Sequence, residues 1–186
     1  NKALRMLIKH FMVRSVRKLG ATYQQIHSLL QKYRNEMSER ELSERREFNH
    51  LVSDSIFRIP MTRTADKYLK GGGKVYFYKF AYPAPACNAA LHVLDLYFIF
   101  GTVGTDDAAD FMKLQGTEGE RQLSEIMMEA WSNFAKHGDP NTDRLPDWPS
   151  YNLETRATMN FNVVPKISIL PMEEIRAAWE IMLQSS

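Results

Sequence analysis

The sequence has little that would support cross-linking or membrane insertion. Cys87 is the only cysteine among 186 residues, which excludes an intrachain disulfide and a multi-cysteine zinc site. A single thiol suits a reducing compartment, so the cytoplasm is favoured, but the residues do not name the compartment. The most apolar run, residues 89–101, is interrupted by His92 and Asp95. It falls short of the roughly 18 to 20 apolar residues that a membrane helix needs, so no membrane segment is expected.

Several motifs of catalysis and cofactor binding are also missing. Gly71-Gly72-Gly73 precedes a strand pattern and no helix, so it does not form a phosphate-binding loop. The five histidines show no metal-ligand spacing, and no serine stands in a Gly-x-Ser-x-Gly nucleophile elbow. We therefore predict no metal and no cofactor.

Acidic residues are absent from residues 1–35, which hold eight Lys and Arg side chains. Such a segment is typical either of a nucleic-acid or acidic-membrane patch, or of a helix face that meets solvent or an acidic surface. The second interpretation is favoured because no nucleic-acid motif accompanies the charge, and we predict no nucleic-acid partner. Asn1 follows no initiator Met and opens no signal peptide, so we expect it to be internal to a longer protein.

What the sequence does contain is typical of a globular α/β protein, with 44% hydrophobic residues. Apolar spacing predicts helices over 4–19 and 22–33, and another that starts at Ser38 and is kinked or restarted by Pro60 before the triple glycine. Residues 75–82 are β-prone on both faces, which indicates a strand inside a covered, typically parallel sheet. The later elements predicted are an irregular connection over 83–105, a short helix over 106–114, a helix over 120–137, a strand over 157–161 and a helix over 171–183.

His92 is the histidine whose setting suggests chemistry. It lies in the connection that follows the buried strand, and ligands and catalytic groups gather at the carboxyl ends of strands in open α/β sheets. Cys87 as a nucleophile paired with His92 is the weaker alternative, and an unreactive thiol is favoured. We assign no function to the four remaining histidines, which are His10, His27, His50 and His137.

The stretch from Ala90 to Gly101, ALHVLDLYFIFG, resembles the histidine segment of type-B carboxylesterases, the family of para-nitrobenzyl esterases and cholinesterases. The family pattern is His, two residues, an acid, Leu, a variable residue, an aromatic, an aliphatic, Phe and Gly. Asp95 stands where Glu is commoner, Val93 where Gly or Ala is frequent, and Tyr97 where Pro is frequent. Tyr97 and Phe98 are expected in the core.

Flanking segments resemble the same family in order and spacing. They are Ser53 to Pro60 before the strand, Val75 to Phe80 in it, Trp131 to Asn141 at the late helix and its end, Trp148 to Tyr151, and Thr158 to Phe161. The resemblance implies the C-terminal portion of an α/β-hydrolase fold, mostly helical, with one buried strand at about 75–82 and a second at about 157–161. We predict one fragment over 1–186, with variable basic helices in 1–45 and the histidine-bearing part in 46–186.

The resemblance also implies a function. His92 would be the catalytic base of a Ser-His-Glu/Asp triad that hydrolyses carboxylic esters, while the nucleophile and the acid are not found in this chain. We therefore expect the chain alone to be inactive and to recruit either the missing N-terminal part or a second copy of itself, since its strand edges would be open. Two alternatives stay open, namely a non-catalytic cholinesterase-like interaction domain and a helical module that binds nucleic acid.

Overall fold

The computed structural model describes residues 22–36 and 50–184. The predicted helix over 4–19 and the helix start at Ser38 lie outside these residues. Contacts divide the chain into two units, the first made of residues 1–67 and 172–186 and the second of residues 68–171. The predicted boundary between parts 1–45 and 46–186 stays a prediction.

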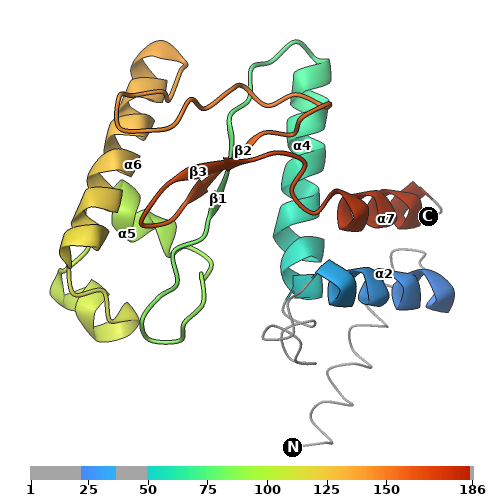
Figure 1. The fold of residues 1–186 in the computed structure, drawn as a ribbon, viewed down its shortest axis with the longest axis horizontal. Coiled ribbons are helices and arrows are strands. Elements are labelled where there is room, and N and C mark those ends of the chain that lie inside the picture. Colours follow the sequence, from blue (N-terminus) through green and yellow to red (C-terminus); the bar gives the residue numbers. More distant parts are fainter. Residues whose placement is uncertain (1–21, 37–49, 185–186) are drawn as a thin grey trace, which may run out of the picture. The chain divides into compact units, whose positions relative to one another are not determined.

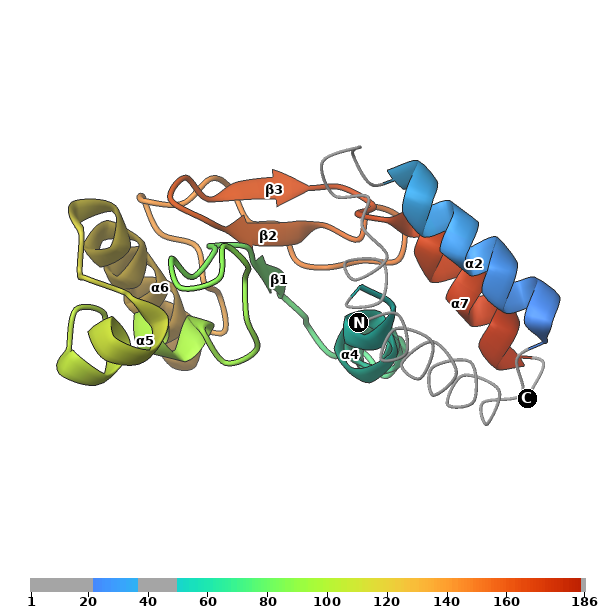
Figure 2. The same cartoon turned by 90° about the horizontal axis from the view of Figure 1, so that it is seen from below.

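The first unit is helical in its described residues. Helices α2 (Tyr23–Glu36) and α7 (Glu173–Gln184) lie side by side (Figures 1 and 2). The predicted start of α2 is confirmed, because the backbone N–H of Thr22 donates to Gln25 Oε1 at 2.8 Å and the Gln25 N–H donates to Thr22 Oγ1 at 3.3 Å. The core of the unit consists of Ile26, Leu29, Tyr33, Leu51, Ile59, Ile175, Trp179 and Met182.

The helix was predicted to kink or to restart at Pro60, and no restart occurs there. The chain is helical from residue 50, passes through a π-helical turn η1 (Asp54–Arg58) and continues as α4 (Ile59–Lys70). A proline clashes with the carbonyl four residues earlier, here that of Ile56. In the wider turn the Ile59 N–H bonds to the Asp54 carbonyl five residues back, so the helix carries on through Pro60. It ends at the triple glycine as predicted, with Gly72 at φ +85°.

A three-stranded sheet organises the second unit. Strand β1 (Phe77–Phe80) pairs in parallel with β2 (Thr158–Phe161), in the register Phe77 to Thr158, and β2 pairs antiparallel with β3 (Lys166–Ser168). The parallel pairing is confirmed and β3 was missed. β1 is shorter than the predicted 75–82 and only half-buried, because β2 covers four residues and β1 has no second strand partner among the described residues.

Helices pack against this sheet through an apolar cluster. They are α5 (Asp95–Ile99), the π-helical turn η2 (Ala108–Met112) and α6 (Glu118–His137), and Figure 1 shows α5 beside α6. The cluster includes Phe98, Leu123, Met127, Met159 and Phe161, all fully buried. The predicted irregular connection over 83–105 is therefore wrong at 95–99. Phe98 is in the core as expected, whereas Tyr97 is half-buried.

Candidate active site around His92

The loop that carries His92 leaves β1 at its carboxyl end and is pinned by a short bridge. Ala84 and Ala89 form an isolated antiparallel bridge, with the Ala84 N–H donating to the Ala89 carbonyl at 2.9 Å. The amides of Cys87 and Asn88 both donate to the Ala84 carbonyl, at 3.1 and 2.8 Å. Ala84 is fully buried, so the first half of the loop is anchored in the core.

His92 stands at the corner of a tight turn. The Leu94 N–H donates to the Leu91 carbonyl at 3.2 Å, which closes a four-residue turn with His92 second and Val93 third. Leu94 is fully buried while His92 is exposed. The turn thus holds the imidazole at the surface of the unit, on a backbone whose next residue is fixed in the core.

Val93 pays a conformational cost for this geometry. Its φ is +64°, in the left-handed region that a third turn residue adopts most readily as glycine. For an L-residue this conformation costs roughly 1–2 kcal/mol, and a β-branched residue there is an outlier. The left-handed turn gives a physical reason for the Gly that the family pattern often has beside its histidine, because glycine has no Cβ to strain there. Strained residues gather at functional sites, where the surrounding structure holds them.

Asp95, the acid of the histidine motif, ties the turn to the sheet. Its carboxylate accepts a 2.8 Å hydrogen bond from the hydroxyl of Tyr78 in β1. Burial, together with the nearby Asp95 carboxylate, raises the pKa of Tyr78 well above its ordinary value. The phenol therefore stays protonated, and remains a hydrogen-bond donor, to higher pH than that of an ordinary tyrosine.

A second set of bonds joins α5 and the strand end to α6. Ser124 Oγ donates to the Phe98 carbonyl at 2.7 Å, and the hydroxyl of Tyr82 donates to Glu120 Oε1 at 3.0 Å. Burial, with a further contribution from Glu120, raises the pKa of Tyr82 to about 12. Glu120 also accepts from the Thr117 N–H at 2.8 Å and so completes the cap of α6. Both ends of the His92 loop are thus bonded to regular structure.

The other residues considered for chemistry lie elsewhere. Cys87 is exposed, with its sulfur 3.8 Å from the Ala89 carbonyl oxygen. His137 occupies the last turn of α6, as predicted. His27 is exposed in α2, and His50 stacks on Tyr33 at 6.5 Å between ring centroids. His10 lies outside the described residues. Among the described residues no three His, Cys, Asp or Glu side chains gather as a metal-binding group.

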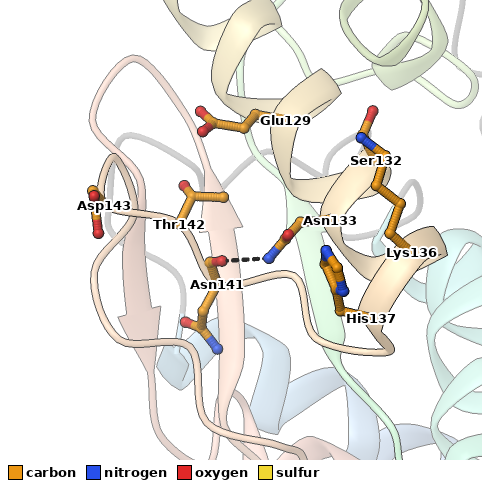
Figure 3. Close-up of a pocket in the computed structure, with 8 residues that line it drawn as sticks. All are labelled: Glu129, Ser132, Asn133, Lys136, His137, Asn141, Thr142 and Asp143. Atoms are coloured by element: carbon orange, nitrogen blue, oxygen red, sulfur yellow. Dashed lines mark hydrogen bonds between the residues drawn. The ribbon is translucent and has the colours of Figure 1, made fainter.

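An open, polar depression of about 370 Å³ lies at the carboxyl end of α6 (Figure 3). His92 is not among the residues that line it. Figure 3 shows Asn133 reaching from α6 toward the following loop, where its amide donates to the Asn141 carbonyl at 2.7 Å. The side-chain amide of Asn141 in turn makes two hydrogen bonds to the backbone of Trp148. Its Nδ2 donates to the Trp148 carbonyl at 2.9 Å, and its Oδ1 accepts from the Trp148 N–H at 2.7 Å. These amides hold the loop after α6, which indicates a structural role.

Asp139 completes that loop. Hydrogen bonds from the Asn141 backbone N–H and the Tyr76 hydroxyl lower the pKa of its carboxyl well below its usual range. The segment from Gly138 to Asn141 resembles the family in sequence, but its hydrogen bonds join positions up to 65 residues apart, as between Lys74 and Asp139. No local pattern signals a bond of that kind.

Comparison with known proteins assigns the family. The sequence profile of the Carboxylesterase family matches residues 1–178. Carboxylesterase 5A of Felis catus is 38% identical over 112 residues, covering 56% of this chain and 20% of the relative. Carboxylesterase 3 of Homo sapiens is 33% identical over 141 residues, covering 71% of this chain and 24% of the relative.

Solved structures agree. The Geobacillus stearothermophilus carboxylesterase EST55 superposes with a TM-score of 0.75 at 29% identity, over 92% of this chain and 35% of that one. A PNB esterase gives a TM-score of 0.65 at 32% identity, over 73% of this chain and 27% of that one. The fold is therefore that of an α/β-hydrolase, and the chain belongs to the carboxylesterase family. It spans between a fifth and a quarter of the length of the two curated relatives.

No helix in residues 22–36 or 50–184 combines the length and apolar character that a membrane crossing requires.

Proposed function

We propose that this chain is the histidine-bearing segment of a serine carboxylesterase and that His92 is its general base. The observation that carries the proposal is the setting of His92. It is an exposed histidine on a strained turn, it follows the carboxyl end of a parallel strand, and it lies in a member of the carboxylesterase family. Ligands of open α/β sheets bind at that edge.

The chemistry follows from the imidazole. In ester hydrolysis His92 takes the proton of a serine hydroxyl as the oxygen attacks the ester carbonyl, and then returns the proton to the departing alcohol. General acid–base catalysis of this kind contributes roughly 10²- to 10⁴-fold to the rate. In this proposal the serine, the acid of the triad and the oxyanion hole are supplied from outside the 186 residues. The chain alone then has no nucleophile to activate and does not hydrolyse esters.

The partner that we propose is the rest of the hydrolase domain, with self-association of this chain as the alternative. Within the described residues β1 pairs only with β2, so its other edge presents backbone groups without strand partners. Large apolar side chains near His92 are also exposed, among them Leu91, Leu96 and Phe100. Sedimentation velocity on the isolated chain tests this point, and a monomer that persists on concentration would count against self-association.

Turnover of a short p-nitrophenyl ester by the full protein tests the catalytic role. The reading frame upstream of Asn1 is sequenced, and the whole protein is expressed with either His92→Ala or His137→Ala. We expect the His92 variant to lose turnover and the His137 variant to keep it, since both lose one imidazole but only His92 lies in the family-like turn. Full activity of His92→Ala would refute the proposal.

A non-catalytic interaction domain is the competing function, because relatives of this fold lose triad members and bind through their surfaces. An upstream frame without a Gly-x-Ser-x-Gly elbow would favour it.

A further inference from the structure

The loop that carries His92 closes back on the strand from which it departs. Tyr78 lies in β1, and Asp95 is the first residue of α5. Their 2.8 Å hydrogen bond joins positions 17 residues apart and therefore encloses the whole His92 loop. The Ala84–Ala89 bridge fixes only the first half of this loop.

The ring of Tyr78, which donates this hydrogen bond, is held in place by its neighbours. Its ring stands edge-on to Trp131, with centroids 4.9 Å apart, and edge-on to Phe161, with centroids 5.9 Å apart. Phe161 is fully buried and Trp131 is half-buried. Aromatic pairs prefer this geometry, and a ring held by two of them presents its hydroxyl in one direction.

Asp95 lies three residues after His92, so fixing its side chain also restricts the backbone that carries His92. Leu94, between them, is fully buried and closes the turn through its bond to Leu91. Val93 sits in the left-handed conformation, which an L-residue leaves when nothing holds it. Leu94 in the core and Asp95 on the sheet together hold the carboxyl side of the turn.

We propose that Tyr78 and Asp95 are positioning residues for His92, and that their hydrogen bond keeps the imidazole in the place where a serine nucleophile meets it. This inference rests on the proposed function and goes beyond it. Neither residue touches the substrate. A base displaced by about 1 Å loses on the order of 10²-fold in rate, so a tie of this kind affects kcat more than substrate binding.

Two matched tyrosine variants of the full protein test the proposal. Tyr78→Phe keeps the ring and removes the hydroxyl that bonds Asp95. Tyr76→Phe removes a hydroxyl two residues earlier, one that donates to Asp139 at 2.7 Å and lies away from the His92 turn. For a p-nitrophenyl ester we expect kcat of Tyr78→Phe to fall about 10- to 100-fold with KM unchanged. Tyr76→Phe keeps the kcat of the parent.

Asp95→Ala gives an independent reading and removes the other half of the bond. Its kcat is expected to fall as in Tyr78→Phe, and the double variant to be no slower than either single variant, because both remove the same interaction. Asp95→Asn keeps an acceptor oxygen and restores most of the rate. This series decides the question even if Tyr78→Phe fails to fold.

The outcomes distinguish failure of the positioning role from failure of the proposed function. A kcat of Tyr78→Phe and Asp95→Ala equal to that of the parent, with His92→Ala inactive, overturns the positioning role alone. An active His92→Ala overturns the proposed function itself. Equal losses of kcat in Tyr78→Phe and Tyr76→Phe would mean that the hydroxyls act only on stability, and would also overturn the positioning role.

Discussion

Each of the two units of this chain is stabilised by a different kind of internal contact. The first unit has a polar chain inside its apolar core: Trp179 Nε1 donates to the Tyr33 hydroxyl at 3.0 Å, and that hydroxyl donates to the Asp54 carboxylate. Arg58 bonds the same carboxylate, with Nε 2.7 Å from Oδ1. Burial, reinforced by Asp54, raises the pKa of Tyr33 well above its ordinary value. Three helical segments of the unit are thus joined through the Tyr33 hydroxyl and the buried Asp54 carboxylate.

The second unit is held chiefly by rings. Phe161 in β2 contacts Tyr78, Trp131 and Trp148, with centroids 5.5 to 5.9 Å apart. Its polar ties, such as that of Tyr78 to Asp95, run from this cluster outward to the loops. Polar groups therefore have different structural roles in the two units. In the first unit they hold one helix against another. In the second they attach a surface loop to the cluster of aromatic rings around Phe161.

The largest effect on stability is expected from a substitution in the aromatic cluster around Phe161. Phe161→Ala removes a fully buried ring that three others contact, and should lower the free energy of unfolding by about 3–5 kcal/mol. Phe111→Ala is the matched control, because that ring is 76% exposed and its loss should cost less than about 0.5 kcal/mol. Urea unfolding followed by circular dichroism measures both. Similar costs would contradict the aromatic description of the second unit.

The polar chain of the first unit should give the next largest effect. Asp54→Asn keeps the shape but removes the charge that Arg58 and Tyr33 face, and should cost about 1.5–3 kcal/mol. Glu174→Gln removes one partner of the exposed Lys32–Glu174 pair, and should cost less than about 1 kcal/mol. Hydrogen exchange should quicken in α2 and α7 of the Asp54 variant. If the amides of β1 and β2 quicken as much, the two units do not differ as described.

Relief of turn strain should give a smaller effect of opposite sign. Val93→Gly removes the side chain from a left-handed residue, and should raise the unfolding free energy by about 0.5–1 kcal/mol after the entropy cost of glycine. Val163→Gly, at a valine that is 52% exposed and has no positive φ, should lower it instead. Thermal unfolding of the two variants compares the signs. Destabilisation by Val93→Gly would show that the turn bears no strain.

The last effect is absent at neutral pH and is expected only under alkaline conditions. The pKa of Tyr82 is raised to about 12 in the folded chain, so above pH of about 10 the unfolded state releases the proton first. The stability that this tyrosine contributes is fully present below that pH and is lost as the pH rises through 12. Tyr82→Phe should therefore flatten the alkaline loss of stability in urea unfolding. Tyr68→Phe, at a tyrosine that is 62% exposed, should leave the slope unchanged.

Local pattern predicted the elements whose signals are short in range. The apolar spacing around Leu123, Met127 and Ala130 identified α6, and all three side chains are buried. Phe134, assigned to the same face by its spacing, is 46% exposed and lies in the last turn of the helix. β3 escaped prediction since its three residues carry no pattern, and the strand exists only through pairing with β2.

In the candidate site, too, some features could be predicted from local sequence and others depend on tertiary packing. Residue order over a dozen positions was enough to predict His92 as the candidate base, its motif, its place after a strand, and the family. The sequence did not predict that Val93 is left-handed, that Asp95 bonds Tyr78, or that Tyr33, Asp54 and Trp179 meet in one core. Such contacts depend on how separate elements pack, and the Tyr33–Trp179 bond spans 146 positions. Packing of that range leaves no signature in a window of sequence.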